Sequence, residues 1–420
     1  MTIERTQPRR RIRHVVRIAL VGLVGLVVLS VAVLVGLSVI YSPGYMTRLI
    51  LWQGADVGDH ARFPARAIPA AADPFTFEPA ADAHAAADAV RDALESSDAV
   101  DGDAEKFLVD TGTQAFIVIR DDEILYESYF GGFERDSIAT SFSTAKSYVS
   151  ALVGIAIEDG AIGSADDSIT DYLPELLERD ESFTDITIRH LLDMSSGIRY
   201  VETGLPNGDD ALTYYFDDLR AVALERAQID EPPGRAWHYV NYNPLLLGLI
   251  LERTTGKPVA DYLATSVWGR IGTEFDASWS LDHNDGFEKM ESGINARPID
   301  FAKLGRLYLE GGAWNGEQVV PAAWVAASTS PTGGAPTGYY PSTMEQPFGT
   351  VSHELYWWRI ARTDGSHAFS ALGNLGQFIF VAPDERLIVV RNGERYGISP
   401  FEWFGLFVTL ADELGNAHGP

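Results

Sequence analysis

The 420-residue sequence contains no cysteine. Disulfides, thiolate metal sites, iron–sulfur clusters and a cysteine nucleophile are therefore excluded. The nine histidines are scattered along the chain, and His353-Glu354 lacks the second histidine of an H-E-x-x-H motif. The chain also has no G-x-S-x-G elbow and no glycine-rich phosphate loop, which argues against an α/β-hydrolase and a phosphate-binding enzyme. We expect no metal site and no cofactor.

Positive charge is scarce outside the N-terminus. The formal net charge is −27, and the first 17 residues carry about +5, so the rest of the chain carries about −32. A domain this acidic repels nucleic acid, and we expect no nucleic-acid partner. The hydrophobic content of 46% is enough for a large folded core.

One long hydrophobic run is present, from Ile18 to Ile40, and it contains no charged residue. About 20 apolar residues cross a bilayer as a helix. Arginines precede the run, so the positive-inside rule predicts a single-pass protein of the cell membrane, with a cytoplasmic N-terminus and an extracytoplasmic domain. The alternative is a cleaved signal peptide. Its hydrophobic region is usually shorter, about 7–15 residues, and an A-x-A-like site follows it, which residues 38–43 do not provide.

Composition divides the chain into four expected parts. Ala65 to Asp103 is rich in Ala, Asp and Pro, which is typical of a linker, although Ala80 to Leu94 fits a surface helix. The expected parts are a basic cytoplasmic segment (1–17), a transmembrane helix (18–40), a juxtamembrane segment and linker (41–108) and a folded domain (109–420).

In the last of these parts, 109–420, residue patterns typical of strands occur at both ends, and a mostly helical pattern lies between them. We therefore expect an α+β fold, in which one sheet is built from both ends of the domain around a helical insertion. The expected strands are 115–119, 124–130, 355–360, 377–381 and 387–391; the helical section covers about 143–330, and a closing helix covers 401–414.

Ser143-Thr144-Ala145-Lys146 opens a segment with a helical apolar pattern. Residues i and i+3 share one face of a helix, so Lys146 can take the proton of the Ser143 hydroxyl. A lysine base must be neutral at some stage, and burial would lower its pKa. An isolated S-x-x-K is about equally consistent with a surface helix.

A second group of polar residues follows about 95 positions later, at Tyr239 and Asn241. A phenol or phenolate at Tyr239 could relay a proton from Lys146 to a leaving group. Asn241 could hydrogen-bond a substrate amide or the lysine. Taken alone, Tyr239 is more often a core or rim aromatic residue.

The ordered set, S-x-x-K followed by Y-x-N, resembles the serine β-lactamase and penicillin-binding protein superfamily. It is similar to class C β-lactamases, D-alanyl-D-alanine carboxypeptidases, family VIII carboxylesterases and 6-aminohexanoate-dimer hydrolases. The stretches at 187–197 and 293–305 add to the resemblance, which covers roughly 110–415. It implies a β-lactamase/DD-peptidase-like fold with Ser143, Lys146 and Tyr239 as catalytic residues.

The third motif of this superfamily is Lys-Thr-Gly or His-x-Gly, and its counterpart is expected at Asn374-Leu375-Gly376. The resemblance implies that Ser143 and Gln377 give the oxyanion N–H groups and that Gly376 lets the substrate backbone approach. Asn374 replaces the cation that helps to bind the carboxylate of β-lactams and D-Ala-D-Ala ends. This departure favours the esterase and aminohexanoate-hydrolase branch.

We therefore expect a membrane-anchored serine hydrolase acting on a small ester, amide or short peptide. A β-lactamase or D-alanyl-D-alanine carboxypeptidase of the same fold is the alternative. A non-catalytic penicillin sensor or binding domain is a third hypothesis. The intact Ser143, Lys146 and Tyr239 argue against it.

Overall fold

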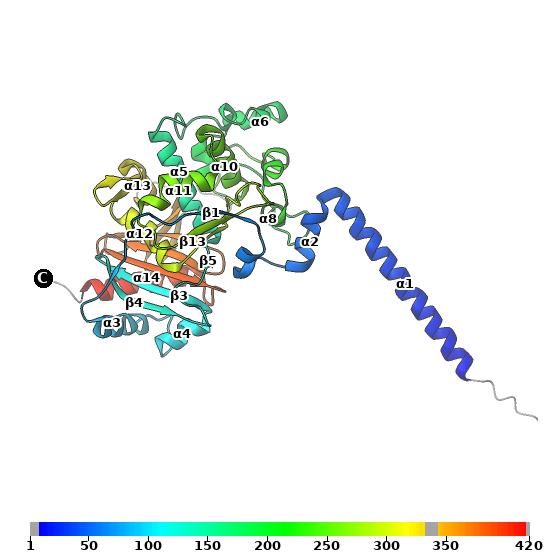
Figure 1. The fold of residues 1–420 in the computed structure, drawn as a ribbon, viewed down its shortest axis with the longest axis horizontal. Helices are drawn as coiled ribbons and strands as arrows, with labels where there is room; N and C mark the ends of the chain where they lie inside the picture. The colour runs from blue at the N-terminus through cyan, green and yellow to red at the C-terminus, as the bar shows by residue number, and fades with distance from the viewer. Residues whose placement is uncertain (1–7, 332–342, 417–420) are drawn as a thin grey trace, which may run out of the picture. The chain divides into compact units, whose positions relative to one another are not determined.

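The computed structural model describes residues 8–331 and 343–416 (Figure 1). The chain divides into two compact units. The first contains residues 1–54 and 215–217, and the second contains residues 55–214 and 218–420.

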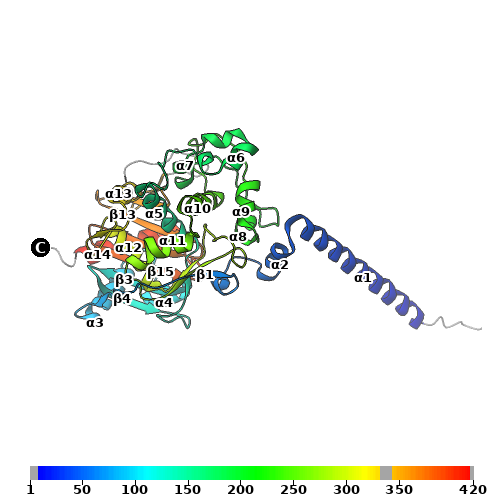
Figure 2. The same ribbon diagram turned by 45° about the horizontal axis from the view of Figure 1, so that its top comes forward.

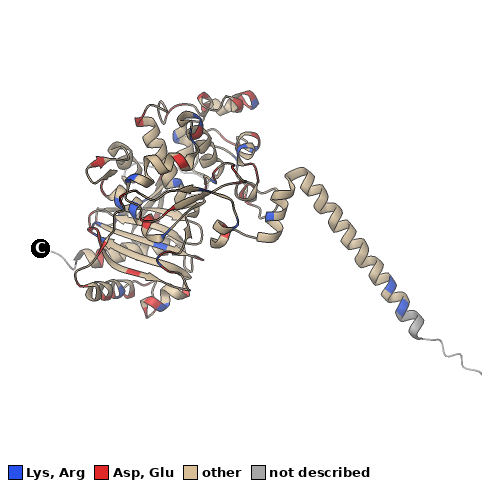
Figure 3. Cartoon of the chain, in the orientation of Figure 1, with Lys and Arg blue, Asp and Glu red and all other residues tan. Residues whose placement is uncertain are grey.

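The first unit begins with a long helix, α1 (Pro8–Tyr41). Among the described residues it is the one helix that is long and apolar enough to cross a membrane. Its charged residues gather at its N-terminal end (Figure 3). Most of the large apolar side chains along the rest of α1 are exposed. A helix that is apolar on all sides suits lipid, and a signal sequence has the same property.

The expected juxtamembrane segment forms a second helix, α2 (Pro43–Trp52), in the same unit. Ser42 caps it by accepting a hydrogen bond from the Tyr45 N–H, and Pro43 occupies the first turn, where its missing N–H costs nothing. The Ser42 hydroxyl also donates to the Asp217 carboxylate at 2.7 Å. Arg48 donates to the carbonyl of Tyr215 at 2.9 Å. These bonds explain why residues 215–217 belong to this unit.

The second unit is built on a sheet that, within the described residues, has nine strands in the order β10-β11-β12-β13-β14-β15-β3-β4-β2. All neighbours are antiparallel except β2 and β4. The strands are β2 (Glu78–Pro79), β3 (Thr113–Arg120), β4 (Glu123–Tyr129), β10 (Thr343–Gln346), β11 (Gly349–Glu354), β12 (Trp357–Arg362), β13 (His367–Gly373), β14 (Gln377–Ala382) and β15 (Leu387–Gly393). The expected sheet from both ends of the domain is confirmed, because β3 pairs with β15.

One expected strand, 355–360, is wrong in its bounds. Leu355 and Tyr356 form the turn between β11 and β12, with φ angles of +47° and +62°. Two left-handed residues suit the right-handed twist of a two-residue hairpin. The Leu355 N–H donates to the Asp193 carboxylate at 3.0 Å, and both turn residues are buried. Their apolar character therefore reflects burial of the turn.

Helices cover both faces of this sheet. The helices α3 (Ala83–Glu95), α4 (Ala104–Asp110) and α14 (Pro400–Asn416) form a core with one face. The helix α12 (Pro298–Leu309) packs on the other face, so closely that a β-carbon on Gly305 would lie 2.8 Å from Ile388. In both ribbon views α3 and α4 lie on the opposite side of the sheet from α5 (Ala145–Glu158) and α10 (Tyr242–Thr255) (Figures 1 and 2).

Residues 55–108, expected to be mostly linker, belong to the second unit, and the helix α3 lies where a surface helix was expected, at Ala80 to Leu94. The strand β1 (Ala65–Ile68) pairs with β6 (Ala277–Ser280), and β2 extends the large sheet. Val90, Leu94 and Leu108 are fully buried. A few apolar residues at helical spacing are enough to dock a helix, even in a stretch of linker-like composition.

The helical section connects the two ends of the large sheet. Within the described residues, a small four-stranded sheet, β1-β6-β7-β5, combines β1 and β5 (Ala139–Thr140), which precede this section, with β6 and β7 (Ile294–Ala296) from within it. The section also contains α6 (Pro174–Arg179), α7 (Ile188–Leu192), α8 (Asp209–Tyr215), α9 (Leu219–Ala221), α11 (Val259–Ser266), β8 (Ala313–Trp314), β9 (Glu317–Gln318) and α13 (Ala322–Thr329).

Candidate active site

Ser143 lies in a short 3₁₀ turn, Phe142–Thr144, which connects β5 to α5. Phe142, just before the serine, has a φ of +42°, a left-handed conformation that is costly for a residue with a side chain. Two hydrogen bonds fix the residue before Phe142, Ser141. Its N–H donates to the Ile294 carbonyl at 2.7 Å, and its hydroxyl accepts from the Ile294 N–H at 3.0 Å. The neighbouring small sheet therefore holds the serine at the start of α5.

Lys146 lies in the first turn of α5 and is 2% exposed. Its Nζ lies 2.9 Å from the Ser143 Oγ and donates to the Glu291 carbonyl at 2.8 Å. Burial lowers the pKa of Lys146 to about 7, and the Glu291 carboxylate opposes this shift. A large fraction of the amine is therefore neutral near pH 7 and can accept a proton.

Tyr239 lies in the loop that precedes α10, with its ring 4.9 Å from the Lys146 Nζ. Burial raises the pKa of Tyr239 well above its usual range. The Ser143 hydroxyl lies near the phenol and favours its ionised form, which lowers the pKa of Tyr239 by less than burial raises it. The phenol is therefore protonated at neutral pH, so it suits the role of a neutral proton donor better than that of a phenolate.

Asn241 caps the start of α10 and lies in the same cleft as Ser143 and Tyr239. Its Nδ2 donates to the Tyr200 hydroxyl at 2.8 Å, which fixes the orientation of the amide. Its Oδ1 is buried and has no hydrogen-bond partner among the described groups. A buried acceptor without a partner is costly, and a substrate N–H could satisfy it.

The cleft has a volume of about 360 Å³. Its walls come from the loop after α7, the loop before α10, the β11–β12 hairpin and the end of β13. The lining residues are Ser143, Glu202, Tyr239, Asn241, Trp358, Leu372, Gly373, Asn374 and Tyr396. Sequence patterns do not reveal Glu202, Gly373 or Tyr396 as site residues. The position of Gly373 directly before Asn374 is the one available signal.

The structure places the expected third motif only partly in the cleft. Asn374 lines it, but Gly376 and Gln377 do not. Gly376 faces Arg391, whose Nη1 donates to its carbonyl at 2.7 Å. The Gln377 side chain is 1% exposed and donates to the Gly393 carbonyl at 2.6 Å. The chain reverses after Gly373, which pairs with Gln377, so the residues after the turn point away.

Gly373 takes the place next to the serine that was expected for Gly376. A β-carbon on Gly373 would lie 3.1 Å from the Ser143 nitrogen and 2.4 Å from the Ser141 carbonyl oxygen. Glycine is therefore required for this close approach. The backbone N–H that follows Gly373 belongs to Asn374. If Gly373 is the glycine of the third motif, the first position of that motif is Ala371. This residue is buried and, like Asn374, carries no charge.

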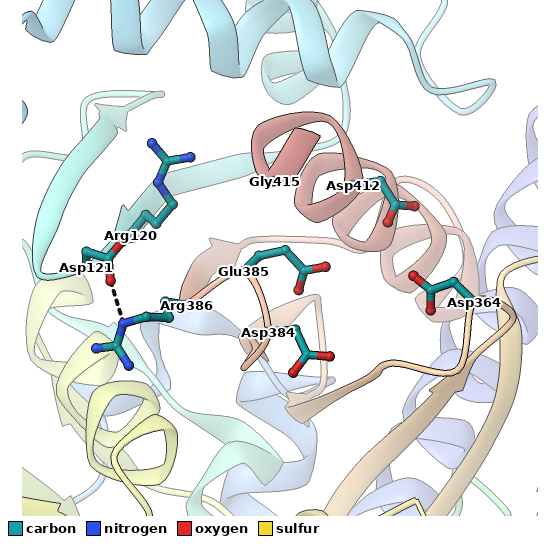
Figure 4. A pocket seen from close by; sticks show the side chains of 8 residues that line it. All are labelled: Arg120, Asp121, Asp364, Asp384, Glu385, Arg386, Asp412 and Gly415. Carbon is teal, nitrogen blue, oxygen red and sulfur yellow. Dashed lines mark hydrogen bonds and ion pairs between the residues drawn. The ribbon is translucent and has the colours of Figure 1, made fainter. Parts of the chain in front are cut away.

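Another hollow, of about 440 Å³, lies elsewhere in the second unit (Figure 4). Its lining residues are charged apart from Gly415, and Arg386 pairs with Asp121 on one side of it. None of its lining residues is a serine, threonine or lysine. The cleft at Ser143 is therefore the candidate active site.

Comparison with known proteins identifies the family of the chain. The Beta-lactamase family model matches residues 105–392. The 6-aminohexanoate-dimer hydrolase of Paenarthrobacter ureafaciens is 28% identical over 322 residues, which are 72% of this chain and 78% of that protein.

Solved structures share the fold. A Bacillus anthracis protein provisionally named a 6-aminohexanoate-dimer hydrolase superposes with a TM-score of 0.68 at 20% identity, over 84% of this chain and 91% of that one. A penicillin-binding protein homologue from Pyrococcus abyssi superposes with a TM-score of 0.54 at 16% identity, over 73% of this chain and 74% of that one.

The fold is that of the serine β-lactamases and penicillin-binding proteins. The chain belongs to the Beta-lactamase family. Within it, the chain is similar to a 6-aminohexanoate-dimer hydrolase, and the family is one of hydrolases.

Proposed function

We propose that this protein is a membrane-anchored serine hydrolase that cleaves an ester or amide through an acyl-enzyme on Ser143. The observation that carries the proposal is the 2.9 Å contact between the Ser143 Oγ and the Lys146 Nζ. Burial lowers the pKa of that lysine to about 7, so the serine has a base beside it at neutral pH.

In the proposed acylation, the neutral Lys146 amine accepts the Ser143 proton as the Oγ attacks the substrate carbonyl. The backbone N–H groups of Ser143 and Asn374 stabilise the oxyanion. Tyr239 gives its phenolic proton to the leaving oxygen or nitrogen and regains one from Lys146. Water then attacks the acyl-enzyme with the same groups acting in reverse. The Glu291 carbonyl holds the Lys146 amine throughout.

The cleft favours a substrate without a carboxylate at the third motif. Asn374 and Ala371 are neutral, and Glu202 adds a negative charge to the wall. A carboxylate of a β-lactam or a D-Ala-D-Ala end would meet no cation there. Trp358 and Leu372 supply apolar wall, and the Asn241 Oδ1 can accept an amide N–H. These features support the proposal that the substrate is a neutral or ammonium-bearing amide or ester of modest size.

Anchoring rests on α1. Arg13 and Arg17 precede its apolar part, and most of the described large apolar side chains after them are exposed. We propose a cytoplasmic N-terminus and an extracytoplasmic hydrolase domain, with membrane lipid as the partner of α1.

The test compares the full chain with its Ser143→Ala variant, both purified in detergent, on p-nitrophenyl butyrate and on the linear dimer of 6-aminohexanoate. We expect at least one substrate to be hydrolysed and the variant to lose at least about 10³-fold in kcat. Full activity in the variant would overturn the acylating serine. A lasting penicilloyl adduct, or rapid penicillin turnover, would instead support the β-lactamase or carboxypeptidase alternative.

A further inference from the structure

A buried ion pair lies beside the Ser–Lys contact and has no part in the proposed chemistry. Lys289 is 1% exposed and Glu291 is 2% exposed. The Lys289 Nζ lies 2.9 Å from the Glu291 Oε1, and the Ser292 hydroxyl donates to the same oxygen at 2.9 Å. The other carboxylate oxygen, Oε2, is buried and has no partner among the described groups. Burying two charges is expensive, and a buried ion pair is weak evidence for stability.

The segment that carries this pair is tightly fixed. The Trp279 indole N–H is shared between the carbonyls of Lys289, at 3.0 Å, and Ser292, at 2.9 Å. The Ser292 N–H also donates to the Lys289 carbonyl, which closes a turn with Glu291 inside it. The Glu291 carbonyl at this turn accepts the hydrogen bond from the Lys146 amine at 2.8 Å.

Lys289 is enclosed as well. Its ammonium donates to the Tyr214 carbonyl and lies 3.9 Å from the centre of the Tyr214 ring and 4.5 Å from that of Phe63. These contacts hold the ammonium where it can meet the Glu291 carboxylate. The carboxylate is therefore fixed near Lys146 through its own backbone and through its partner.

We propose that Glu291, paired with Lys289, is a positioning residue for Lys146. The Glu291 carbonyl orients the amine so that its lone pair faces the Ser143 hydroxyl. The carboxylate adds a negative charge that determines the pH at which the amine gains its proton. This inference rests on the proposed function, because it assigns a role to Lys146 as the base.

The titratable groups around Lys146 are Tyr239, His353 and the Lys289–Glu291 pair. Burial keeps the Tyr239 phenol protonated, because it raises its pKa well above the usual range. Burial lowers the pKa of His353 to about 3, so this imidazole is neutral. Near neutral pH, the charge that favours the Lys146 ammonium comes from Glu291. Removing it should let the amine lose its proton at lower pH.

The experiment measures how fast a fluorophosphonate probe modifies Ser143 in the detergent-purified full chain at pH 4.5–9, followed by intact mass. The variants are Glu291→Gln and the double change Lys289→Met with Glu291→Gln, which leaves no unpaired charge. In Glu291→Gln we expect the acid limb of the rate profile to move about one pH unit lower, and in the double variant, which also loses the positive charge of Lys289, we expect a smaller shift in the same direction. At pH values below the limb, the probe should therefore react with the Glu291→Gln variant about tenfold faster than with the chain of unchanged sequence.

The matched control is Asp300→Asn, which breaks another buried ion pair, with Lys303 at 3.1 Å, outside the cleft. It should lower the thermal midpoint without moving the limb. If both Glu291 variants behave like this control, the inference is wrong and the pair is only structural. If the probe does not react with the chain of unchanged sequence, or if it also labels the Ser143→Ala variant at another site, the proposed function itself fails.

Discussion

At the scale of single residues, the spacing of Ser143 and Lys146 places their side chains together, and their environment determines the pKa of the lysine. Their separation of three residues already predicts a shared helix face, and the 2.9 Å contact agrees with it. The spacing does not fix the pKa of the lysine. That depends on burial by residues far away in the sequence, such as Glu291 and Tyr239.

The first residue-scale prediction concerns pH. Lys146 must be neutral to accept the serine proton, and burial lowers its pKa to about 7. Below this value the protonated fraction grows, so kcat/KM should fall about tenfold for each pH unit. A pH profile on p-nitrophenyl butyrate measures this. A flat profile between pH 5 and 7 would contradict the role of Lys146 as base.

The second residue-scale prediction concerns the leaving-group proton. Tyr239→Phe removes the phenol and keeps the ring, so kcat should fall by about 10²–10⁴-fold while the fold is retained. Tyr148→Phe, which removes a buried phenol outside the cleft, is the matched control and should keep its activity. Equal activity in the two variants would count against proton transfer by Tyr239.

At the scale of elements, the β13–β14 hairpin decides which glycine lies against the serine. The sequence places a glycine on either side of a short turn, at Gly373 and Gly376. Pairing of Gly373 with Gln377 puts the first glycine against Ser143 and turns the second toward Arg391. The strand register determines which of the two glycines lies next to the serine, and this register depends on the whole sheet.

The element-scale prediction concerns α3, which lies in a stretch of linker-like composition. Leu94 is fully buried in the core between α3, α4, α14 and the sheet. Leu94→Ala should destabilise the second unit by about 2–5 kcal/mol because it leaves a cavity. Leu177→Ala is the control, since that side chain is 44% exposed in α6. Denaturant unfolding measures both, and equal midpoints would mean that α3 does not stabilise the fold.

At the scale of the whole molecule, charge and hydropathy are strongly segregated along the chain. The apolar stretch lies in the first unit, and the acidic residues lie mostly in the second. An acidic, self-repelling domain joined to an apolar helix fits the proposed membrane-anchored protein.

The whole-molecule prediction concerns membrane attachment. If α1 spans the membrane, the full-length chain should remain in the membrane pellet after carbonate extraction at high pH. A signal peptide cleaved near residue 42 would instead release a shorter soluble chain, which mass spectrometry would identify. Deleting residues 8–41 should move the protein to the soluble fraction in either case, which makes this deletion a control for the extraction.

By itself the sequence determined the family resemblance, the two-ended sheet, the membrane-length apolar helix and the Ser143–Lys146 pair. Local spacing and hydrophobic periodicity carry this information. Only the tertiary structure decided that residues 55–108 join the folded unit, that Gly373 takes the place expected of Gly376, and that Glu202 lines the cleft. It also revealed the Glu291–Lys289 pair beside Lys146. These features arise from burial and strand register, which depend on residues far apart in the chain.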